Sequence, residues 1–403
     1  MKNKFDKILT TAVFIIMIFG FTILFWVQKD NNISEDENRV LQTLPEFSFD
    51  RLISGDYSTD MNDYFADQFP FRNFFINAKS RIELALLKKE NNGVVLGDDG
   101  QLAVRSSLNR DFDEIEIQNI DQFDKTRLSI LLDIEKQFDS KLTAAGIDYC
   151  FVMPMRSVDI AQSAMPAGFP NYRSDELLSF VREELRDTHF LDMYDMFREK
   201  YDAGEYVYYR TDHHWTTLGA YYCYVEIMKS FGMEPYPLEA FTQEKISDSF
   251  YGTTWSKSGF RFVGSDEIYY FHNNEISDDK FTSIVKSNFA EINSFTGFYN
   301  HEKLKEKDKY GSFMSGSSTH ISITMNNTEG REKILLLKDS FGHSVAPFLA
   351  LHFDIEMVDL DYLDKGIQIY FNNYNFDKVV VIYNLDNVIS NDNLQRLKVN
   401  FEK

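Results

Sequence analysis

The chain has 403 residues, of which 15% are aromatic, so it is long enough for two or three domains, or one large domain with appendages, around a sizeable core. Its formal net charge of −21, with no basic stripe, argues against nucleic-acid binding and disfavours a strongly anionic polymer substrate unless a local basic cleft overrides that field. The two cysteines, Cys150 and Cys223, could form one disulfide but no disulfide framework, and buried free thiols are the favoured state.

An apolar segment lies near the N-terminus. Residues 8–27 carry no charge, and as a helix they extend about 30 Å, which matches the hydrocarbon thickness of a bilayer. Lys2, Lys4 and Lys7 precede the segment, which predicts a cytoplasmic N-terminus and export of everything that follows. A cleaved signal peptide is the alternative, but the end of the segment offers no small-x-small cleavage site. We therefore predict an uncleaved, single-pass anchor in the cell membrane, from Ile8 to Val27.

The patterns predict three parts in all. Residues 1–30 form the cytoplasmic tip and the anchor, residues 31–120 a linker with a helical and hairpin region, and residues 121–403 an α/β domain. In the second part, helical spacing runs over residues 60–90 with a break at Phe69-Pro70-Phe71-Arg72. Residues 91–100 follow as a turn, a short strand and a second turn.

Strands and helices alternate in the third part, which is typical of βαβ units and a mostly parallel sheet. Before residue 240, helices are predicted at 121–145, 176–186, 194–201 and 216–231, and strands at 148–153 and 190–193. Residues from about 240 to 330 are rich in Ser, Asn, Asp and Gly and predict a β-rich insertion with hairpin character. Beyond it, strands are predicted at 334–337, 355–360 and 379–383, and helices at 342–352 and 365–372.

Ser340 lies where a predicted apolar strand ends and a helix begins. Ligands bind at this edge of open α/β sheets, and the N–H groups and positive dipole end of the helix would face an oxyanion formed there. Serine needs an adjacent base, oriented by a third group, to act as a nucleophile. The alternative is that Asp339 and Ser340 simply cap the helix, and strand–Asp-Ser–helix alone favours that alternative.

Asp212 and His214 are two residues apart in Tyr209-Arg210-Thr211-Asp212-His213-His214-Trp215. On a loop or extended segment both side chains can face one site, where the carboxylate fixes the imidazole tautomer. His213 would then face elsewhere, and Trp215 would pack as a wall of the site. A buried, hydrogen-bonded histidine pair in the core is the alternative reading of these residues.

A metal site is the competing chemistry, because Asp212, His213 and His214 could together ligate a divalent ion. The other histidines show no regular ligand spacing, and the cysteines are not clustered. We therefore predict neither a metal nor another cofactor. His343 follows Ser340 by three residues and could approach it, although a satisfied core or surface histidine is favoured.

Two motifs together carry a resemblance to a known family. Thr211-Asp212-His213-His214-Trp215 and Leu337-Lys338-Asp339-Ser340-Phe341 resemble the DHHW family, in the alginate O-acetyltransferase-like branch of the SGNH hydrolase superfamily. Six further stretches fit that family: Glu37-Asn38-Arg39, residues 67–72, Asn91-Asn92-Gly93-Val94 with Leu96-Gly97, and Tyr251-Gly252-Thr253 ahead of Ser258-Gly259. The resemblance covers the chain from about residue 35 to its end.

The resemblance implies an SGNH-like, flavodoxin-like fold and a serine site, with Ser340 as nucleophile, His214 as base and Asp212 as its orienting carboxylate. The order Asp, His, Ser resembles the permuted arrangement of the alginate acetyltransferase branch. That branch implies action outside the cytoplasmic membrane on a polysaccharide, often with a membrane-bound O-acyltransferase that delivers acyl groups. The resemblance also makes Asn384 a candidate oxyanion donor, and we add Trp215, Tyr251 and Arg156 as candidate substrate contacts; for Arg156 a surface salt bridge is the alternative.

The chain departs from the family in two places. Lys338 replaces the superfamily glycine of Gly-Asp-Ser, which the DHHW branch accepts, and Asp361 stands where relatives often carry arginine. The second change alters the charge near the site. The sequence therefore predicts an exported acyl-ester enzyme, in the first place an O-acetyltransferase that modifies a cell-surface or extracellular polysaccharide through an acyl-serine intermediate. A carbohydrate esterase with the same three residues and a non-catalytic glycan-binding scaffold are the alternatives. A metal hydrolase is a fourth reading.

Overall fold

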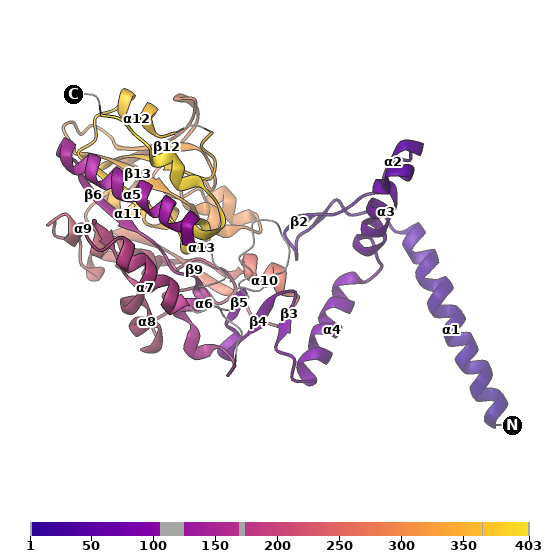
Figure 1. Cartoon of the computed structure of the whole chain (residues 1–403). Helices are drawn as coiled ribbons and strands as arrows, with labels where there is room; N and C mark the ends of the chain where they lie inside the picture. Colours follow the sequence, from indigo (N-terminus) through magenta and orange to yellow (C-terminus); the bar gives the residue numbers. More distant parts are fainter. Residues whose placement is uncertain (1, 105–124, 169–173, 365, 402–403) are drawn as a thin grey trace. The chain divides into compact units, whose positions relative to one another are not determined.

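The computed structural model describes residues 2–104, 125–168, 174–364 and 366–401 (Figure 1). They form two units, the first made of Met1–Asn92 with Ser256–Phe262, the second of Gly93–Trp255 with Val263–Lys403. Within these residues Cys150 and Cys223 are free and buried, as predicted. The starts of the helices predicted at 121 and 365 lie outside the described residues.

The first unit is helical and begins with an apolar helix. Helix α1 (Lys2–Val27) contains a 24-residue apolar stretch, Lys4–Val27, long enough to cross a membrane. Aromatic side chains at the end of α1 pack against the other helices of this unit. Phe25, for example, lies edge-on to Tyr64, with 5.4 Å between the ring centroids. The predicted break at residues 69–72 is confirmed, because it separates α3 from α4. The other elements are β1 (Ile33–Ser34), β2 (Arg39–Val40), α2 (Phe49–Ser54), α3 (Asp56–Asp67), α4 (Arg72–Ala85) and β3 (Glu90–Asn91).

An eight-stranded sheet with the order β11-β10-β12-β14-β13-β15-β6-β7 organises the second unit. Strands β14, β13, β15, β6 and β7 pair in parallel, and β12, β10 and β11 extend the same sheet in antiparallel fashion. The predicted α/β fold with a mostly parallel sheet is confirmed. These strands are β6 (Asp148–Val152), β7 (Phe190–Leu191), β10 (Phe281–Ser287), β11 (Ala290–Thr296), β12 (His320–Met325), β13 (Lys333–Lys338), β14 (Asp354–Asp359) and β15 (Lys378–Ile382).

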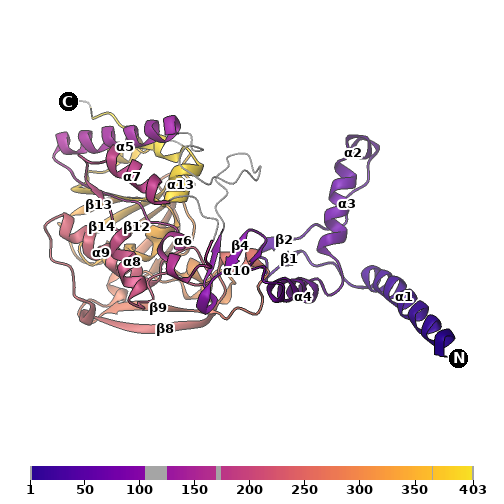
Figure 2. The ribbon, with the colours of Figure 1, turned by 60° about the horizontal axis from the view of Figure 1, so that its bottom comes forward.

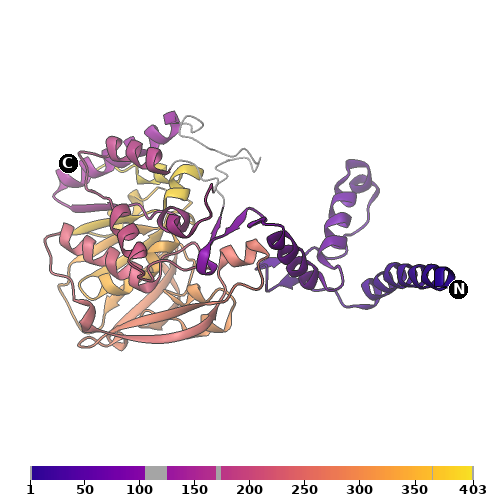
Figure 3. The same ribbon diagram turned by 90° about the horizontal axis from the view of Figure 1, so that it is seen from below.

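Helices flank this sheet (Figures 2 and 3). The main ones are α5 (Lys125–Ala145), α6 (Ser157–Ile160), α7 (Ser174–Glu184), α8 (Tyr194–Asp202), α9 (Thr217–Ser230), α11 (Ala346–Ala350), α12 (Gln368–Asn373) and α13 (Leu385–Ser390). A further short helix, α10 (Thr253–Ser258), follows strand β8 (Phe241–Phe250) in the chain. The central strands β13, β14 and β15 are buried almost throughout, and every residue of β15 is buried. Such apolar runs are typical of parallel strands covered on both faces.

The predicted β-rich insertion is also confirmed. It contains a long hairpin of β8 (Phe241–Phe250) and β9 (Asp266–Asn273), which runs along one side of the unit (Figure 2), and a second hairpin of β10 and β11. Because β10 and β12 pair with each other and β12 pairs with β14, the insertion also widens the main sheet. A further short hairpin, β4 (Val94–Leu96) with β5 (Leu102–Val104), corresponds to the turn–strand–turn predicted after residue 91.

A buried carboxyl on α5 is expected to make the unfolding free energy of the unit depend on pH. Glu135 is inaccessible to solvent, and Tyr149 on β6 donates a hydrogen bond of 3.1 Å to its Oε1. Burial disfavours the charged form and raises the pKa of Glu135 to about 8. Between the ordinary pKa and this value the folded chain holds one more proton than the unfolded chain, so the stabilisation is complete at low pH and is lost as pH rises through about 8.

Glu135→Gln is therefore expected to remove this pH dependence while keeping an oxygen for Tyr149. The unfolding free energy of the wild type should fall relative to the variant by up to about 1.4 kcal/mol per pH unit between roughly pH 5 and 8. Urea unfolding of both proteins at pH 6, 7, 8 and 9 measures the difference, in which other titrations cancel. A constant difference across that range would contradict a buried neutral Glu135.

Candidate active site

The segment that carries Asp212 and His214 is a short loop closed by a bridge between Tyr208 and Trp215. Tyr209 donates its N–H to the carbonyl of His214 at 3.1 Å, and the predicted cap Thr216 begins α9 by accepting from the Gly219 N–H. Both side chains of the pair are buried, with 2% of Asp212 and 5% of His214 exposed. The loop therefore holds them in a fixed position before any ligand binds.

Ser340 lies at the end of β13, at the start of a short 3₁₀ helix, Ser340–Ser344, which precedes α11. The helix predicted from residue 342 thus begins two residues earlier and in a tighter form. From β13 the chain crosses to β14 on one side and later returns to β15 on the other, so Ser340 occupies the point where the strand order reverses. Ligands bind at such points in open α/β sheets.

Asp339 performs the capping that was the alternative reading for Ser340. Its Oδ1 accepts the Phe341 N–H at 3.0 Å, and its Oδ2 accepts the Asn384 N–H at 2.6 Å and the Asn387 amide at 3.0 Å. Burial raises the pKa of Asp339 to about 6. Because Asp339 satisfies the helix start, the Ser340 hydroxyl is left to face the loop of His214.

The three predicted side chains meet in one hydrogen-bonded row. Ser340 Oγ lies 2.7 Å from His214 Nε2, and His214 Nδ1 lies 2.5 Å from Asp212 Oδ1. Burial alone would raise the pKa of Asp212, but the neighbouring His213 and His214 and the hydrogen bonds from His214 and Thr253 lower it well below its usual range. Asp212 is thus an anion that places the Nδ1 proton of His214 and leaves Nε2 to accept from Ser340. Their catalytic roles stay a prediction.

The second oxygen of Asp212 is held by residues from the insertion. Thr253 donates both its N–H, at 2.8 Å, and its hydroxyl, at 3.0 Å, to Asp212 Oδ2. A side chain at Gly252 would place its Cβ only 2.3 Å from the Cβ of Asp212, so this position admits glycine alone. These two contacts explain why glycine and threonine stand side by side in the motif Tyr251-Gly252-Thr253. Tyr251 itself packs against Trp255, with 4.5 Å between ring centroids.

Aromatic rings enclose the imidazole. Tyr310, from the insertion, stacks on His214 with a centroid separation of 4.0 Å and an interplanar angle of 11°, and Phe341 lies 4.9 Å away. Trp215 is fully buried and donates its indole N–H to Ser344 Oγ at 2.9 Å, so it packs where a wall was expected. Sequence reasoning missed Tyr310 and offered no signal for it.

A buried carboxylate anchors the start of the loop and was also missed. Asp266 is inaccessible and accepts the Thr211 N–H at 2.7 Å and the Arg210 N–H at 3.2 Å. The hydroxyls of Thr211 and Tyr206 donate to the same carboxylate. Asp266 therefore fixes the chain immediately before Asp212.

Two of the other candidates hold the surrounding turns. Asn384 caps α13 by accepting the Asp386 N–H, and it donates its amide to the Pro154 carbonyl at 2.9 Å. Arg156 is buried and forms a bidentate pair with Asp159 at 2.7 and 2.6 Å. Asn384 contacts the Ser340 turn through its hydrogen bond to Asp339. The guanidinium of Arg156 is instead bound by both oxygens of Asp159.

The two departures from the family pattern have local partners. Lys338 is inaccessible and donates to Asp359 and to His343, whose Nε2 is 2.6 Å away. This contact places His343 in the core beneath the turn. Asp361 accepts hydrogen bonds of 2.7 Å from the Tyr383 hydroxyl and from the Asn393 amide, so its charge is solvated by neutral donors.

A metal reading of the loop competes with these contacts. Ligand atoms of Asp212, His213 and His214 lie within 4.8 Å of one another, but both ring nitrogens of His214 are hydrogen-bonded to Ser340 and Asp212. His213 Nδ1 lies 2.7 Å from the Thr253 hydroxyl. Because an ion would have to displace the Ser340 or Asp212 contact of His214, the arrangement fits proton transfer better than metal ligation.

Comparisons with known proteins agree with this architecture. A DHHW family protein from Eubacterium siraeum is 21% identical, with a TM-score of 0.57, over 75% of this chain and 97% of that one. The structure of Bacillus cereus PatB1 with a sulfonyl adduct is 19% identical, with a TM-score of 0.59, over 76% of this chain and all of that one. At these identities the likeness establishes a shared fold. No curated protein matches the chain.

The family comparison covers the segment that contains the site. The model described as DHHW protein matches residues 171–359, from just before α7 to the end of β14. Both sequence motifs that suggested the resemblance fall inside this segment. The matched segment is just under half of the chain, and Asp212, His214 and Ser340 all lie within it.

Proposed function

We propose that this chain is an exported, membrane-anchored serine enzyme that transfers an acyl group, in the first place acetyl, to a hydroxyl of a cell-surface or extracellular polysaccharide. The observation that carries the proposal is the row Ser340–His214–Asp212, with contacts of 2.7 and 2.5 Å. A hydroxyl, an imidazole and a carboxylate in this order form the apparatus of acyl transfer on several unrelated folds. That the acceptor is a polysaccharide is inferred from the resemblance to the alginate O-acetyltransferase-like branch.

The reaction follows from the atoms that face one another. His214 Nε2 takes the proton of Ser340 as Oγ attacks the donor ester carbonyl, and the same proton then goes to the departing alcohol. In the second half, His214 removes the proton of the glycan hydroxyl, which attacks the acyl-Ser340 ester and restores the free serine. Asp212 stays ionised and stabilises the imidazolium in both halves.

The oxyanion of each tetrahedral intermediate needs a donor at the Ser340 turn. Phe341 and Gly342 already donate their N–H groups to Asp339, at 3.0 and 3.1 Å. Among the described N–H groups of this turn we therefore assign that of Ser340 to the oxyanion. The backbone N–H of Asn384 donates to Asp339 and holds this residue beside the turn. Its side-chain amide has a second N–H besides the one that donates to Pro154, and that N–H is the candidate for a second donor.

The membrane part of the proposal rests on α1. The segment Lys4–Val27 is long enough to span a bilayer, and the lysines at its N-terminal end, ahead of the uncharged residues 8–27, favour a cytoplasmic N-terminus. The site would then lie outside the membrane, where cytoplasmic acyl donors are absent. A membrane-bound O-acyltransferase is therefore the partner that we propose as the source of the acyl group.

Labelling by a serine-directed sulfonyl fluoride tests the proposal. The full chain in detergent, treated with phenylmethanesulfonyl fluoride, is expected to gain one sulfonyl group on the peptide that contains Ser340, and to lose turnover of 4-nitrophenyl acetate in parallel. Acetylated oligosaccharide, detected by mass spectrometry when an acceptor is added, would show transfer, whereas acetate alone would show the esterase. Wild-type turnover in a sample whose Ser340 peptide is fully sulfonylated would reject Ser340 as nucleophile.

A further inference from the structure

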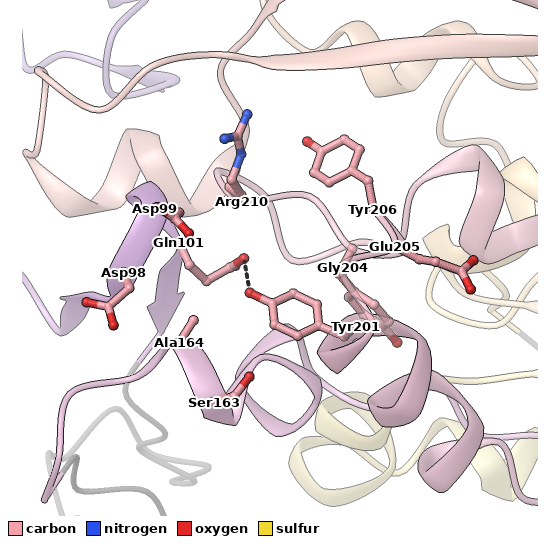
Figure 4. A pocket seen from close by; sticks show the side chains of 11 residues that line it. Asp98, Asp99, Gln101, Ser163, Ala164, Tyr201, Gly204, Glu205, Tyr206 and Arg210 are labelled. Carbon is pink, nitrogen blue, oxygen red and sulfur yellow. Dashed lines mark hydrogen bonds between the residues drawn. The ribbon is translucent and has the colours of Figure 1, made fainter.

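A cavity of about 370 Å³ opens beside the segment that leads into Asp212 (Figure 4). Its lining comes from a 3₁₀ turn after β4 (Asp98–Gly100), a second one after α6 (Gln162–Ala164), the end of α8, and residues 204–210. The size falls within the range that holds a small ligand or one unit of a larger one. All of the lining residues belong to the second unit.

The walls of the cavity are held in place by tight backbone contacts. A Cβ at Gly97 would lie 2.6 Å from the Ala164 carbonyl oxygen, so glycine lets the two 3₁₀ turns meet. Gln101 is 1% exposed and accepts a hydrogen bond of 3.1 Å from the Tyr201 hydroxyl, drawn in Figure 4. Leu96-Gly97, a stretch that resembled the family, thus has a structural role in building this cavity.

The cavity is also connected to the catalytic loop. Gln101 donates its amide to the Tyr209 carbonyl at 3.3 Å, and Leu102 donates its N–H to the Arg210 carbonyl at 2.8 Å. Asp266 then links two lining residues, Tyr206 and Arg210, to the Thr211 backbone. A ligand in the cavity would therefore contact the same rigid segment that positions Asp212.

The lining combines ring faces with more acidic than basic groups. Tyr201 and Tyr206 are half-buried, which leaves part of each ring for contact, whereas their hydroxyls donate to Gln101 and Asp266. Asp98 and Asp99 are exposed at the rim, Glu205 lies opposite them, and Arg210 is the one cation among the eleven lining residues. Arg210 is itself paired with Asp266, and Glu205 with Lys200 at 3.2 Å, so among the lining residues the carboxylates outnumber the cation through Asp98 and Asp99.

The rim carboxylate Asp99 is held in an uncommon conformation. Its φ of 52° lies in the left-handed region, which non-glycine residues seldom adopt and which is often found where a side chain is aimed for function. Carboxylates accept hydrogen bonds from sugar hydroxyls and form stronger, charge-assisted ones with ammonium groups. The accessible parts of the Tyr201 and Tyr206 rings match the apolar faces of pyranose rings.

We propose that this cavity is a subsite for the acceptor glycan and that it takes a sugar unit that is neutral or bears an amino group, in preference to a uronate. This inference rests on the proposed transfer to a polysaccharide and narrows its substrate class. A uronate would bring a further negative charge against Asp98 and Asp99, whereas a glucosamine unit would place its ammonium between them. The chain's overall charge of −21 acts in the same direction.

Calorimetric titration of the full chain in detergent, carrying Ser340→Ala to prevent turnover, tests the preference. The probes are the tetrasaccharides of glucosamine, N-acetylglucosamine and galacturonate. We expect the glucosamine tetramer to bind at least tenfold more tightly than the galacturonate tetramer, with the N-acetylated tetramer between them. Galacturonate binding as tight as that of glucosamine, or binding of none of the three, would overturn the proposal.

A double variant that removes both rim carboxylates tests whether the oligosaccharide binds in this cavity. Asp98→Asn with Asp99→Asn should weaken glucosamine-tetramer binding at least tenfold, since asparagine tolerates the left-handed conformation. The matched control, Asp133→Asn with Asp187→Asn, removes the same charge from exposed positions outside the cavity and should change affinity less than twofold. Hydrogen exchange should show protection of peptides 98–101 and 201–210 by the bound tetramer.

Equal losses in the two variant pairs, or protection elsewhere, would place binding at another surface and refute the subsite. The outcome is separable from that of the proposed function. Loss of this inference would leave Ser340 labelling and ester turnover intact, and failure of Ser340 labelling would leave oligosaccharide binding by the Ser340→Ala protein unaffected.

Discussion

Replacing Ser340 with alanine is expected to lower the turnover of a small acetyl ester by roughly a thousandfold or more, and His214→Ala should do the same. Each change removes one end of the 2.7 Å contact through which the proton must pass. Because the two groups act as a unit, the double variant should be no slower than either single variant. Initial rates of 4-nitrophenyl acetate cleavage by the full chain in detergent measure all three.

The control for this comparison is His301→Ala, which removes an exposed histidine from the insertion and should leave the rate unchanged. Thermal unfolding of each variant shows whether the fold is retained, and the small side chain of alanine fits the half-buried position of Ser340. Wild-type turnover by Ser340→Ala would end the catalytic assignment. Losses that multiply in the double variant would show that the two side chains act independently.

Elements with strong local patterns were predictable from the sequence. The apolar runs of β13 and β15 and the cap of α9 at Thr216 are visible in short windows, because hydrophobic spacing and capping chemistry are local properties. The helix after β13 was misjudged at its start. Asp339 caps the turn with its side chain and brings Ser340 itself into a 3₁₀ helix, and that depends on long-range donors from Asn384 and Asn387.

The candidate site was predictable only in the part that the two sequence motifs carry. Asp212, His214 and Ser340 belong to two compact motifs, and the reversal of strand order at β13 explains how residues 126 positions apart meet. Tyr310, Thr253 and Asp266 contact the same groups but come from the insertion. Nothing in one sequence pairs an insertion residue with a distant loop, because that pairing depends on how β8, β9 and the following turns fold back over α9. The short motif at Gly252 was the one partial signal.

Asp212→Asn is expected to lower turnover by about 10⁴-fold, with little change in KM, although it alters a single atom. Oδ1 accepts the His214 backbone N–H at 3.0 Å and the ring Nδ1–H, and Oδ2 accepts the Thr253 N–H and hydroxyl.

Four donors thus converge on Asp212, and an amide offers a single acceptor oxygen. If its nitrogen faces His214, it opposes the His214 backbone N–H, and the imidazole proton moves to Nε2, so that Nε2 can no longer take the Ser340 proton. If its nitrogen faces Thr253, a backbone N–H opposes it and the loop must shift. Nitrogen-15 spectra of the histidine rings distinguish these two routes. An Asp212→Asn enzyme within tenfold of the wild-type rate would mean that His214 is oriented without its carboxylate, and the observed contact would then be structural alone.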